Sequence, residues 1–258
     1  MTVPYLTGMI VCKNEARRIG ACLESLAFCD ERVAIDSGSD DGTLELLEKH
    51  GVRVISRPWS GMNEQKEYGR TSSRGEWLLN LDADEVATPE LRAEIVHLLE
   101  RGGPPGVDAY AIPFRNHFRS VWVRRSGYYP DPHVRLVRRE RVRWDASAPV
   151  HDRVVVEGAI GRLSEHIDHY SFESIGHFLQ KSCAYAAAFA AAEHRAGRRA
   201  GVSTIALHTA FRFFKAYVLK GGFLEGALGL TISGLQAYEV FQKYVRLWEL
   251  GRFSDHGG

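Results

Sequence analysis

The 258-residue sequence has few cysteines, no long apolar run and no excess of charge of one sign. Its four cysteines form no CxxC pair and show no Cys/His spacing typical of zinc sites, so we expect reduced thiols. No stretch of about 18 apolar residues indicates a membrane-spanning helix. The formal net charge is +1, so the whole chain has no electrostatic preference for nucleic acid, and binding to anionic surfaces would need local patches.

The N-terminal residues also lack the basic and then apolar pattern of a secretory signal, which predicts a cytoplasmic protein. Hydrophobic residues make up 45% of the chain and charged residues 25%. This balance is typical of a globular protein with a complete apolar core.

About a hundred N-terminal residues alternate between strand-like and helix-like segments. The expected strands are 6–11, 32–35, 52–55 and 77–81, and the expected helices are 16–27, 43–50, 61–73 and 89–101. This alternation predicts βαβ units and a mostly parallel sheet. Shorter strands of a mixed sheet are expected at 109–114, 121–124, 134–137 and 154–157. We predict an α/β domain over residues 1–173 and a helical region over residues 174–258. The helical region is a candidate for membrane association.

Polar clusters follow three of the expected strands, at Asn14-Glu15, at 36–41 and at 82–84. Ligands of parallel sheets bind beyond the carboxyl ends of the strands, so these clusters are candidates for one site.

Asp82 and Asp84 stand one residue apart after an apolar strand. Carboxylates at the mouth of a sheet suit Mg²⁺ or Mn²⁺ shared with substrate phosphates. The alternative is a solvated turn that caps the next helix.

The segment 36–43, with sequence DSGSDDGT, combines an acidic strand end with Ser and Gly, which allow close approach of a ligand to the backbone. The helix beginning near Thr43 offers free N–H groups. The segment is not GxGxxG, which disfavours a dinucleotide fold. An ordinary capping turn is the alternative.

Together these motifs resemble family 2 glycosyltransferases of the GT-A fold. The resemblance rests on the order and spacing of 12–15, 36–43, 65–66, 75–77 and 81–85. Further segments resemble the branch that adds glucose to the lipopolysaccharide inner core: 129–138, 149–152, 163, 166–170, 211–229 and 243–244. Two positions depart from that branch, because Asp152 stands where glutamate is expected and Lys66 where arginine is commoner.

The resemblance implies a GT-A-type, mostly parallel nucleotide-sugar-binding sheet, a mixed acceptor-side sheet and a C-terminal helical region. It implies Mg²⁺ or Mn²⁺ as cofactor, held by Asp84 and Asp82. His151 is a further candidate ligand of this metal. The implied nucleotide-sugar-binding residues are Asn14, Glu15, Asp36, Ser37, Gly38, Gln65, Lys66, Asp82 and Arg135. Asp36 would contact the base of a uridine nucleotide. A hydrogen-bonded loop histidine is the alternative for His151, and His166 and His169 are expected to be structural.

An inverting transfer needs one carboxylate that takes a proton from the acceptor hydroxyl. Asp152, which follows His151 after a proline, is the first candidate, and Asp131, between two prolines, is the second. Asp145 and Asp168 are further possibilities.

The segment 202–220 has a basic face with His208, Arg212 and Lys215, and aromatic residues including Phe213 and Phe214 on the other side. Such a helix is typical of a membrane-surface anchor, or of a helix that packs on its domain.

The sequence therefore predicts an inverting transfer of a hexose, with glucose from UDP-glucose as the first choice, to a lipid-linked lipopolysaccharide or lipooligosaccharide core sugar. The expected location is the inner face of the cytoplasmic membrane. Hexosyl or N-acetylhexosaminyl transfer to another glycolipid or capsule precursor is an alternative, as is a non-catalytic scaffold that binds nucleotide sugars. A nucleotidyltransferase is disfavoured because residues 12–15 are not a Gly-rich, basic phosphate loop.

Overall fold

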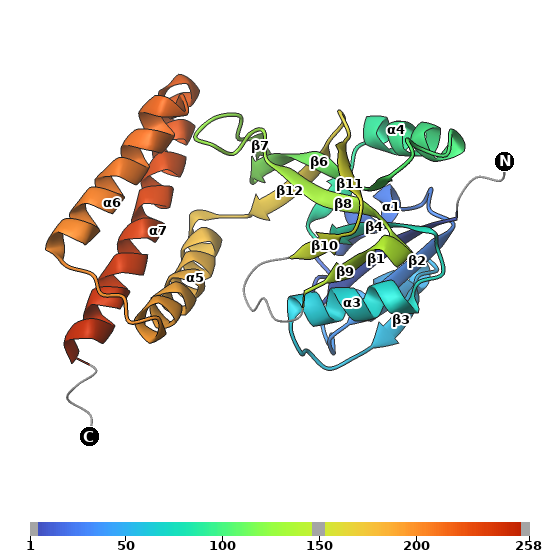
Figure 1. Cartoon of the computed structure of the whole chain (residues 1–258), viewed down its shortest axis with the longest axis horizontal. Coiled ribbons are helices and arrows are strands. Elements are labelled where there is room, and N and C mark those ends of the chain that lie inside the picture. Colours follow the sequence, from blue (N-terminus) through green and yellow to red (C-terminus); the bar gives the residue numbers. More distant parts are fainter. Residues whose placement is uncertain (1–4, 146–152, 254–258) are drawn as a thin grey trace. The chain divides into compact units, whose positions relative to one another are not determined.

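The computed structural model describes residues 5–145 and 153–253 (Figure 1). The chain forms two compact units. The sheet unit contains the described residues up to Phe114 together with Asp131–His169, and the helical unit contains Arg115–Pro130 and the residues from Tyr170 onward.

Four parallel strands form the first half of the sheet, in the order β3-β2-β1-β4. They are β1 (Leu6–Cys12), β2 (Glu31–Asp36), β3 (Arg53–Ser56) and β4 (Trp77–Asp82). All seven residues of β1 are buried, as expected for a central parallel strand that is covered on both faces.

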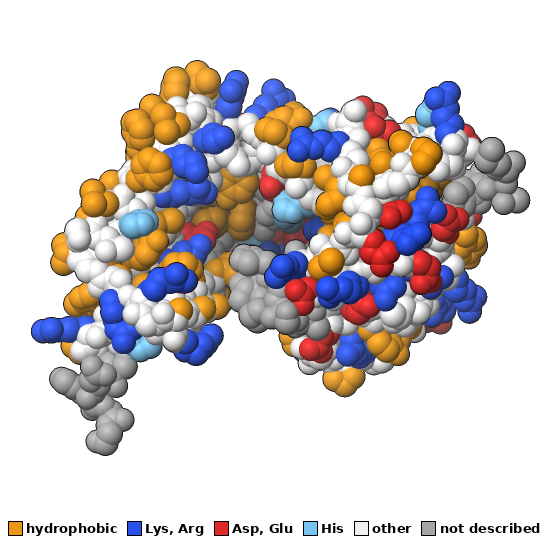
Figure 2. Space-filling view, viewed as in Figure 1, with side chains coloured by type: hydrophobic (Ala, Val, Ile, Leu, Met, Phe, Trp, Pro, Cys, Tyr) orange, Lys and Arg blue, Asp and Glu red, His pale blue; other side chains and the backbone are white. Residues whose placement is uncertain are grey.

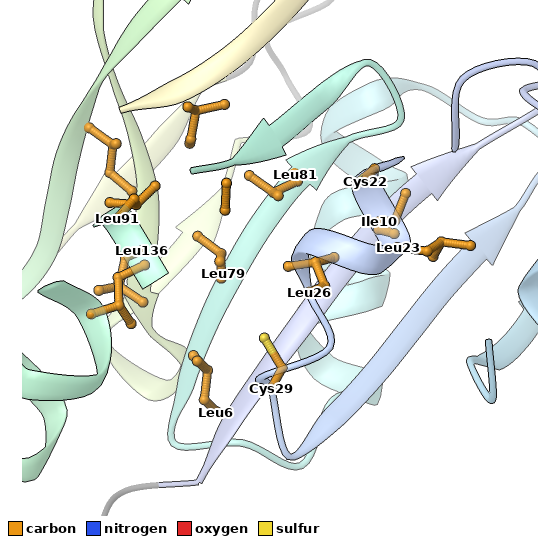
Figure 3. Close-up of a cluster of buried hydrophobic side chains, with 14 of the residues drawn as sticks. Leu6, Ile10, Cys22, Leu23, Leu26, Cys29, Leu79, Leu81, Leu91 and Leu136 are labelled. Atoms are coloured by element: carbon orange, nitrogen blue, oxygen red, sulfur yellow. The ribbon is translucent and has the colours of Figure 1, made fainter. Parts of the chain in front are cut away.

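Helices cover both faces of these strands. The large core cluster lies between the sheet and helices α1 (Ile19–Ser25), α2 (Thr43–Lys49) and α4 (Pro89–Glu100), and Figure 3 shows part of it, including Ile10, Leu23 and Leu79. On the other face lies α3 (Met62–Ser72), where a β-carbon at Gly69 would come within 2.6 Å of the Met9 sulfur. The close approach of α3 to β1 therefore depends on a glycine at this position.

The remaining strands extend the sheet with mixed directions, and β8 (Pro132–Arg138) pairs antiparallel with both β4 and β6. The others are β5 (Glu85–Ala87), β6 (Val107–Phe118), β7 (Val121–Trp122), β11 (Ala159–Arg162) and β12 (Ile167–Phe172). A separate hairpin is formed by β9 (Val142–Trp144) and β10 (Val154–Val156).

The helical unit contains α5 (Ile175–Arg195), α6 (Val202–Phe214) and α7 (Gly226–Phe253). A π-helical segment, Lys215–Leu219, and a 3₁₀ turn, Gly222–Glu225, connect α6 to α7. Both α5 and α6 pack against α7.

The expected α/β fold, with a mostly parallel sheet, a mixed part and a C-terminal helical region, is confirmed. Sequence periodicity did not predict β5, β9, β11 and β12, which have three to six residues each. Such short strands give too few residues for an alternating pattern to stand out. The domain boundary expected after residue 173 stays a prediction.

Among the described residues, no helix combines the length and the apolar character needed to cross a bilayer.

Because α7 packs on the 3₁₀ turn, we expect alanine substitutions at two glycines of this helix to differ in their effect on stability. A β-carbon at Gly229 would overlap the carbonyl oxygen of Gly222, whereas one at Gly234 would meet no heavy atom within 4 Å. Gly229→Ala is therefore expected to destabilise the protein by about 1–3 kcal/mol. Gly234→Ala should be neutral or stabilising by up to about 1 kcal/mol, because alanine favours a helix interior. Urea unfolding followed by circular dichroism measures both; equal effects would contradict the packing.

Candidate functional site

The loops that follow β1, β2 and β4 meet at one edge of the sheet, because these strands are parallel neighbours. This edge holds the three polar clusters expected from the sequence. The site is described below from these loops outward.

Hydrogen bonds join the loop after β1 to the loop after β2. The Asn14 N–H donates to Ser39 Oγ (2.9 Å), and Asn14 Oδ1 accepts from the Asp40 N–H (2.9 Å). The Glu15 N–H donates to Thr43 Oγ1 (2.8 Å). Asn14 has a left-handed backbone conformation (φ 56°), which asparagine tolerates better than most residues. The two loops thus form one connected surface.

Asp36 shapes the second loop. Its Oδ2 accepts the N–H groups of Gly38 (2.8 Å) and Ser39 (3.0 Å), and its Oδ1 accepts from the Ser39 hydroxyl. Burial, with the nearby Asp36 carboxylate, raises the pKa of the Cys12 thiol to about 12, so this cysteine stays protonated. A carboxylate has room for further acceptor contacts, so these bonds are compatible with the predicted contact to a nucleobase.

Gln65 is fully buried and holds neighbouring segments together. Its Nε2 donates to Ser37 Oγ (3.0 Å) and to the carbonyl oxygens of Arg57 (3.2 Å) and Pro58 (3.0 Å). Its Oε1 accepts from the Arg57 guanidinium at 3.1 Å, so the amide of Gln65 is bonded at both ends within the fold. Its predicted direct contact with a nucleotide sugar stays untested.

A group of two carboxylates and two cations lies at the end of β4, in which Lys66, Glu85 and Arg135 are buried and Asp82 is partly exposed. Lys66 Nζ is 3.0 Å from Asp82 Oδ1, and Arg135 Nη2 is 3.2 Å from Asp82 Oδ2. Arg135 also donates to both carboxylate oxygens of Glu85, from Nη2 at 2.7 Å and from Nε at 2.9 Å. We call Lys66, Asp82, Glu85 and Arg135 the charged cluster.

Electrostatics separate the two acids of the charged cluster. Burial opposes ionisation of Asp82, but Lys66 and Arg135 hold its pKa well below the usual range. Burial raises the pKa of Glu85 to about 7 against the attraction of Arg135, and the Asp82 charge adds to this rise. Asp82 is therefore the more firmly ionised of the two carboxylates.

Asp84, the second acid of the motif, is more loosely held. Its Oδ2 lies 3.6 Å from Arg18 Nη1 and 3.8 Å from His169 Nε2, both longer than hydrogen bonds. No role was predicted for Arg18, and His169 was expected to be structural. A site role for His169 was not predictable from the sequence. The residue comes close to Asp84 because β12 pairs with β5.

The ring of Phe114 links the acidic turn to the other strands. Three groups surround it: the His133 ring at 4.5 Å, the Arg135 guanidinium at 5.1 Å and the His169 ring at 5.2 Å. His133 Nε2 in turn lies 3.1 Å from Asp131 Oδ1. The second candidate base therefore lies in the group of residues around Phe114, with a histidine beside it.

The residues of the acidic turn fit a divalent cation that shares ligands with a substrate. Within residues 5–145 and 153–253, no group of three or more His, Cys, Asp or Glu side chains forms a cage for a metal ion. Mg²⁺ is commonly held by only one or two carboxylates, with phosphate oxygens and water completing its shell. Asp84, loosely paired and only partly buried, with Asp82 beside it, supplies such a pair of oxygen ligands.

Two predicted site residues, His151 and Asp152, lie outside the described residues. Their roles as metal ligand and as general base stay predictions.

Comparison with known proteins gives one family. The model of the family described as Glycosyl transferase family 2 matches residues 9–153. The lipopolysaccharide core biosynthesis glycosyltransferase LpsC of Rhizobium meliloti is 28% identical over 93% of each chain. An uncharacterized glycosyltransferase of Rickettsia bellii is 29% identical over 95% of this chain and 86% of its own length. Among solved structures, S. aureus TarS covers 71% of this chain and 39% of its own, with 16% identity and a TM-score of 0.49.

The charged cluster implies that two arginines of β8, Arg135 and Arg138, contribute unequally to stability. Arg135→Gln would leave the buried carboxylate of Glu85 without its cation and the partly exposed Asp82 with Lys66 alone, and is expected to cost about 3–5 kcal/mol of unfolding free energy. Arg138→Gln removes ion pairs of a half-exposed side chain with Glu76 and Asp108, and should cost about 1 kcal/mol or less. Urea unfolding followed by tryptophan fluorescence compares them.

Glu85→Gln in the Arg135→Gln background serves as the control, because it removes one of the stranded charges and should recover part of the loss. Equal costs for the two arginine variants would contradict the assignment of a buried cluster.

Proposed function

Because the chain belongs to glycosyl transferase family 2, we propose that it is an inverting, metal-dependent enzyme that transfers a hexose to a lipopolysaccharide core sugar. The observation that carries the proposal is the acidic turn at the edge of the sheet. There Asp82 lies beside two fixed cations, Lys66 and Arg135, and Asp84 lies next to it in the same turn. Together with a divalent cation, this combination suits a nucleoside diphosphate better than a neutral ligand.

The proposed donor is a UDP-sugar, with UDP-glucose as the first choice. The loop after β2 would hold the nucleoside, with Asp36 accepting from the uracil N–H and Ser37 and Gly38 forming the adjoining backbone surface. The loop after β1, with Asn14 and Glu15, would border it. A buried polar group left without a partner costs about 1–3 kcal/mol, so this contact would select uridine over guanosine nucleotides.

Asp84, with Asp82, would hold Mg²⁺ or Mn²⁺, which offsets the charge developing on the leaving diphosphate. Lys66 and Arg135 would orient the same phosphates, because both cations are fixed by Asp82 before any ligand binds. The general base would take the proton of the acceptor hydroxyl on the side opposite the diphosphate.

The relatives and the chemistry support the proposed acceptor and location. LpsC is named for lipopolysaccharide core biosynthesis and aligns over nearly the whole chain, which supports a core sugar as the acceptor. Such an acceptor is linked to lipid. We therefore place the enzyme at the inner face of the cytoplasmic membrane, bound peripherally.

The function is tested by release of UDP from UDP-glucose with a lipopolysaccharide core acceptor, with and without Mn²⁺. Asp84→Asn is expected to lower turnover roughly a thousandfold, since the loss of a charged ligand removes several kcal/mol of transition-state stabilisation. Glu76→Gln is the control, because Glu76 precedes the other end of β4, about 20 Å of extended chain from Asp82.

Full turnover in Asp84→Asn would refute the metal assignment. In the same assay UDP is expected to compete better than GDP, and Asp36→Asn should reduce that preference. Equal competition by the two nucleotides would refute the assignment of the base-binding loop.

The general base is tested by Asp152→Asn and Asp131→Asn. The variant that removes the base is expected to lose about 10²–10⁴-fold in kcat with little change in the KM for donor. The other variant should retain most of its kcat. If Asp131 is the base, His133→Gln should also move the pH profile of kcat, because His133 Nε2 lies 3.1 Å from its carboxylate. Full kcat in both aspartate variants would leave neither as the base.

A further inference from the structure

The net charge of the chain conceals a strong separation of charge between its two units. The helical unit, residues 115–130 and 170–258, contains 14 Lys and Arg but only six Asp and Glu, which gives a formal charge of +8. The whole chain has a formal charge of +1, so the sheet unit has −7. The helical unit therefore has the excess of basic residues that the net charge of the whole chain does not reveal.

Helix α6 and the π-helical segment that follows it present an apolar stripe to solvent. Leu207, Phe211, Phe214 and Val218 recur at intervals of three and four residues, and each side chain is between 44% and 69% exposed. The sequence predicts a basic face with His208, Arg212 and Lys215. In the structure His208 and Lys215 are exposed, and the His208 ring lies 4.4 Å from the ring of Tyr244 on α7. The helix thus exposes apolar side chains as well as basic ones.

The stripe continues around the connection between α6 and α7. Here Leu219, Phe223 and Leu224 are 61%, 51% and 61% exposed. We call Val218, Leu219, Phe223 and Leu224 the apolar tip. Figure 2 shows hydrophobic side chains gathered, with Lys and Arg side chains beside them, over the end of the helical unit where α6 and α7 meet.

Polar groups lie beneath this exposed apolar surface. Ser126, Ser233 and Gln236 are at most 5% exposed. The two serine hydroxyls lie 3.1 Å apart, and Gln236 Nε2 donates to the Ser126 carbonyl oxygen at 3.1 Å. The buried interior of this end is therefore partly polar, because these groups lie beside the buried side chains of Val123, Ala216 and Ile232, while the apolar tip side chains are exposed.

Hydrogen bonds hold the backbone of this end in place. The carboxylate of Glu225 accepts the N–H groups of Arg124 (2.7 Å) and Arg125 (3.2 Å), and the Ser126 N–H donates to the Lys220 carbonyl oxygen (3.1 Å). A β-carbon at Gly222 would come within 2.6 Å of the Ser126 hydroxyl oxygen. The apolar side chains are thus exposed by a fixed backbone.

We propose that the apolar tip inserts into the surface of an anionic lipid bilayer and that the basic residues around it bind the headgroups. Lys215, Lys220 and Arg124 are exposed next to the tip in the chain or in the fold, and the Arg124 guanidinium lies 4.5 Å from the ring of Trp122. Apolar side chains ringed by cations and an interfacial aromatic residue match the layers of a membrane surface, where hydrocarbon lies below charged headgroups.

Charge decides between a bilayer and a second copy of the chain as the occupant of this surface. Two copies that joined tip to tip would bring two units of formal charge +8 together, whereas anionic lipid attracts that charge. The inference deepens the proposed peripheral location and rests on it only for the view that the acceptor is linked to lipid. It names the surface and the mode of contact.

The test is co-sedimentation of the full chain with vesicles of phosphatidylcholine, with and without phosphatidylglycerol, at low and high salt. Leu219→Ser/Phe223→Ser is expected to weaken binding by on the order of tenfold for each side chain removed from the lipid. Val202→Ser/Phe253→Ser is the matched control. These two residues are 80% and 57% exposed, and they lie at the other end of the α6–α7 pair, about 40 Å away along α7. The control should bind as the unaltered chain does.

Lys215→Glu/Lys220→Glu tests the headgroup contact. It should weaken binding to anionic vesicles roughly fivefold per lysine at low salt and have less effect at high salt. Light scattering without vesicles reports on self-association. Failure of the unaltered chain to bind anionic vesicles, or equal losses in the tip variant and the matched control, would overturn the proposal. So would a dimer that the tip variant converts to a monomer.

UDP release with a soluble core oligosaccharide is measured on the same variants. The tip variant should keep this turnover, because no tip residue belongs to the catalytic machinery. Loss of vesicle binding with retained turnover supports the membrane contact. Retained vesicle binding in a chain that releases no UDP would refute the proposed transfer and leave the membrane contact standing.

Discussion

The buried contact of Arg135 with Glu85 and Asp82 is the constraint on which the arrangement of the site depends. The three residues come from β8, from β5 and from the end of β4, so one guanidinium fixes the mutual position of three strands. Burial of charge is costly, and it is tolerated only where geometry and partners are good. Here Arg135 meets Glu85 with two hydrogen bonds, and Lys66 supplies the second cation.

A consequence for chemistry follows from the balance of the charged cluster. With all four groups ionised, its two acids and two cations carry no net charge. A bound diphosphate would therefore bring negative charge that the cluster alone does not offset. Asp84 lies beside the cluster, and its ion pairs with Arg18 and His169 among the described residues are long, so its carboxylate could also bind a cation. This charge balance is the physical reason for proposing that a divalent metal ion accompanies the donor.

The sequence predicted the parallel half of the sheet and the three polar loops, because each depends on residues close together in the chain. A buried strand followed by Asp36 or by Asp82 is visible in a short window. The partners of these acids are not visible there, since Arg135 is 53 residues from Asp82 along the chain and His169 reaches Asp84 only through the pairing of β12 with β5. Glu85 was seen as part of a motif, but its burial was not predictable without β8.

The exposure of side chains at the end of α6 could not be predicted from the sequence for a related reason. Assigning a helix face from sequence assumes one turn every 3.6 residues and a known direction of the core. In this chain the segment Lys215–Leu219 is π-helical, with the Lys220 N–H bonded to the Lys215 carbonyl oxygen, so regular spacing fails where α6 ends. The interior of this end also contains polar groups, Ser126, Ser233 and Gln236, beside the buried Ala216 and Ile232. The periodicity of the sequence therefore does not reveal which side chains are exposed where α6 ends. The exposure of apolar side chains over a partly polar interior is a property of packing, and only the folded chain shows it.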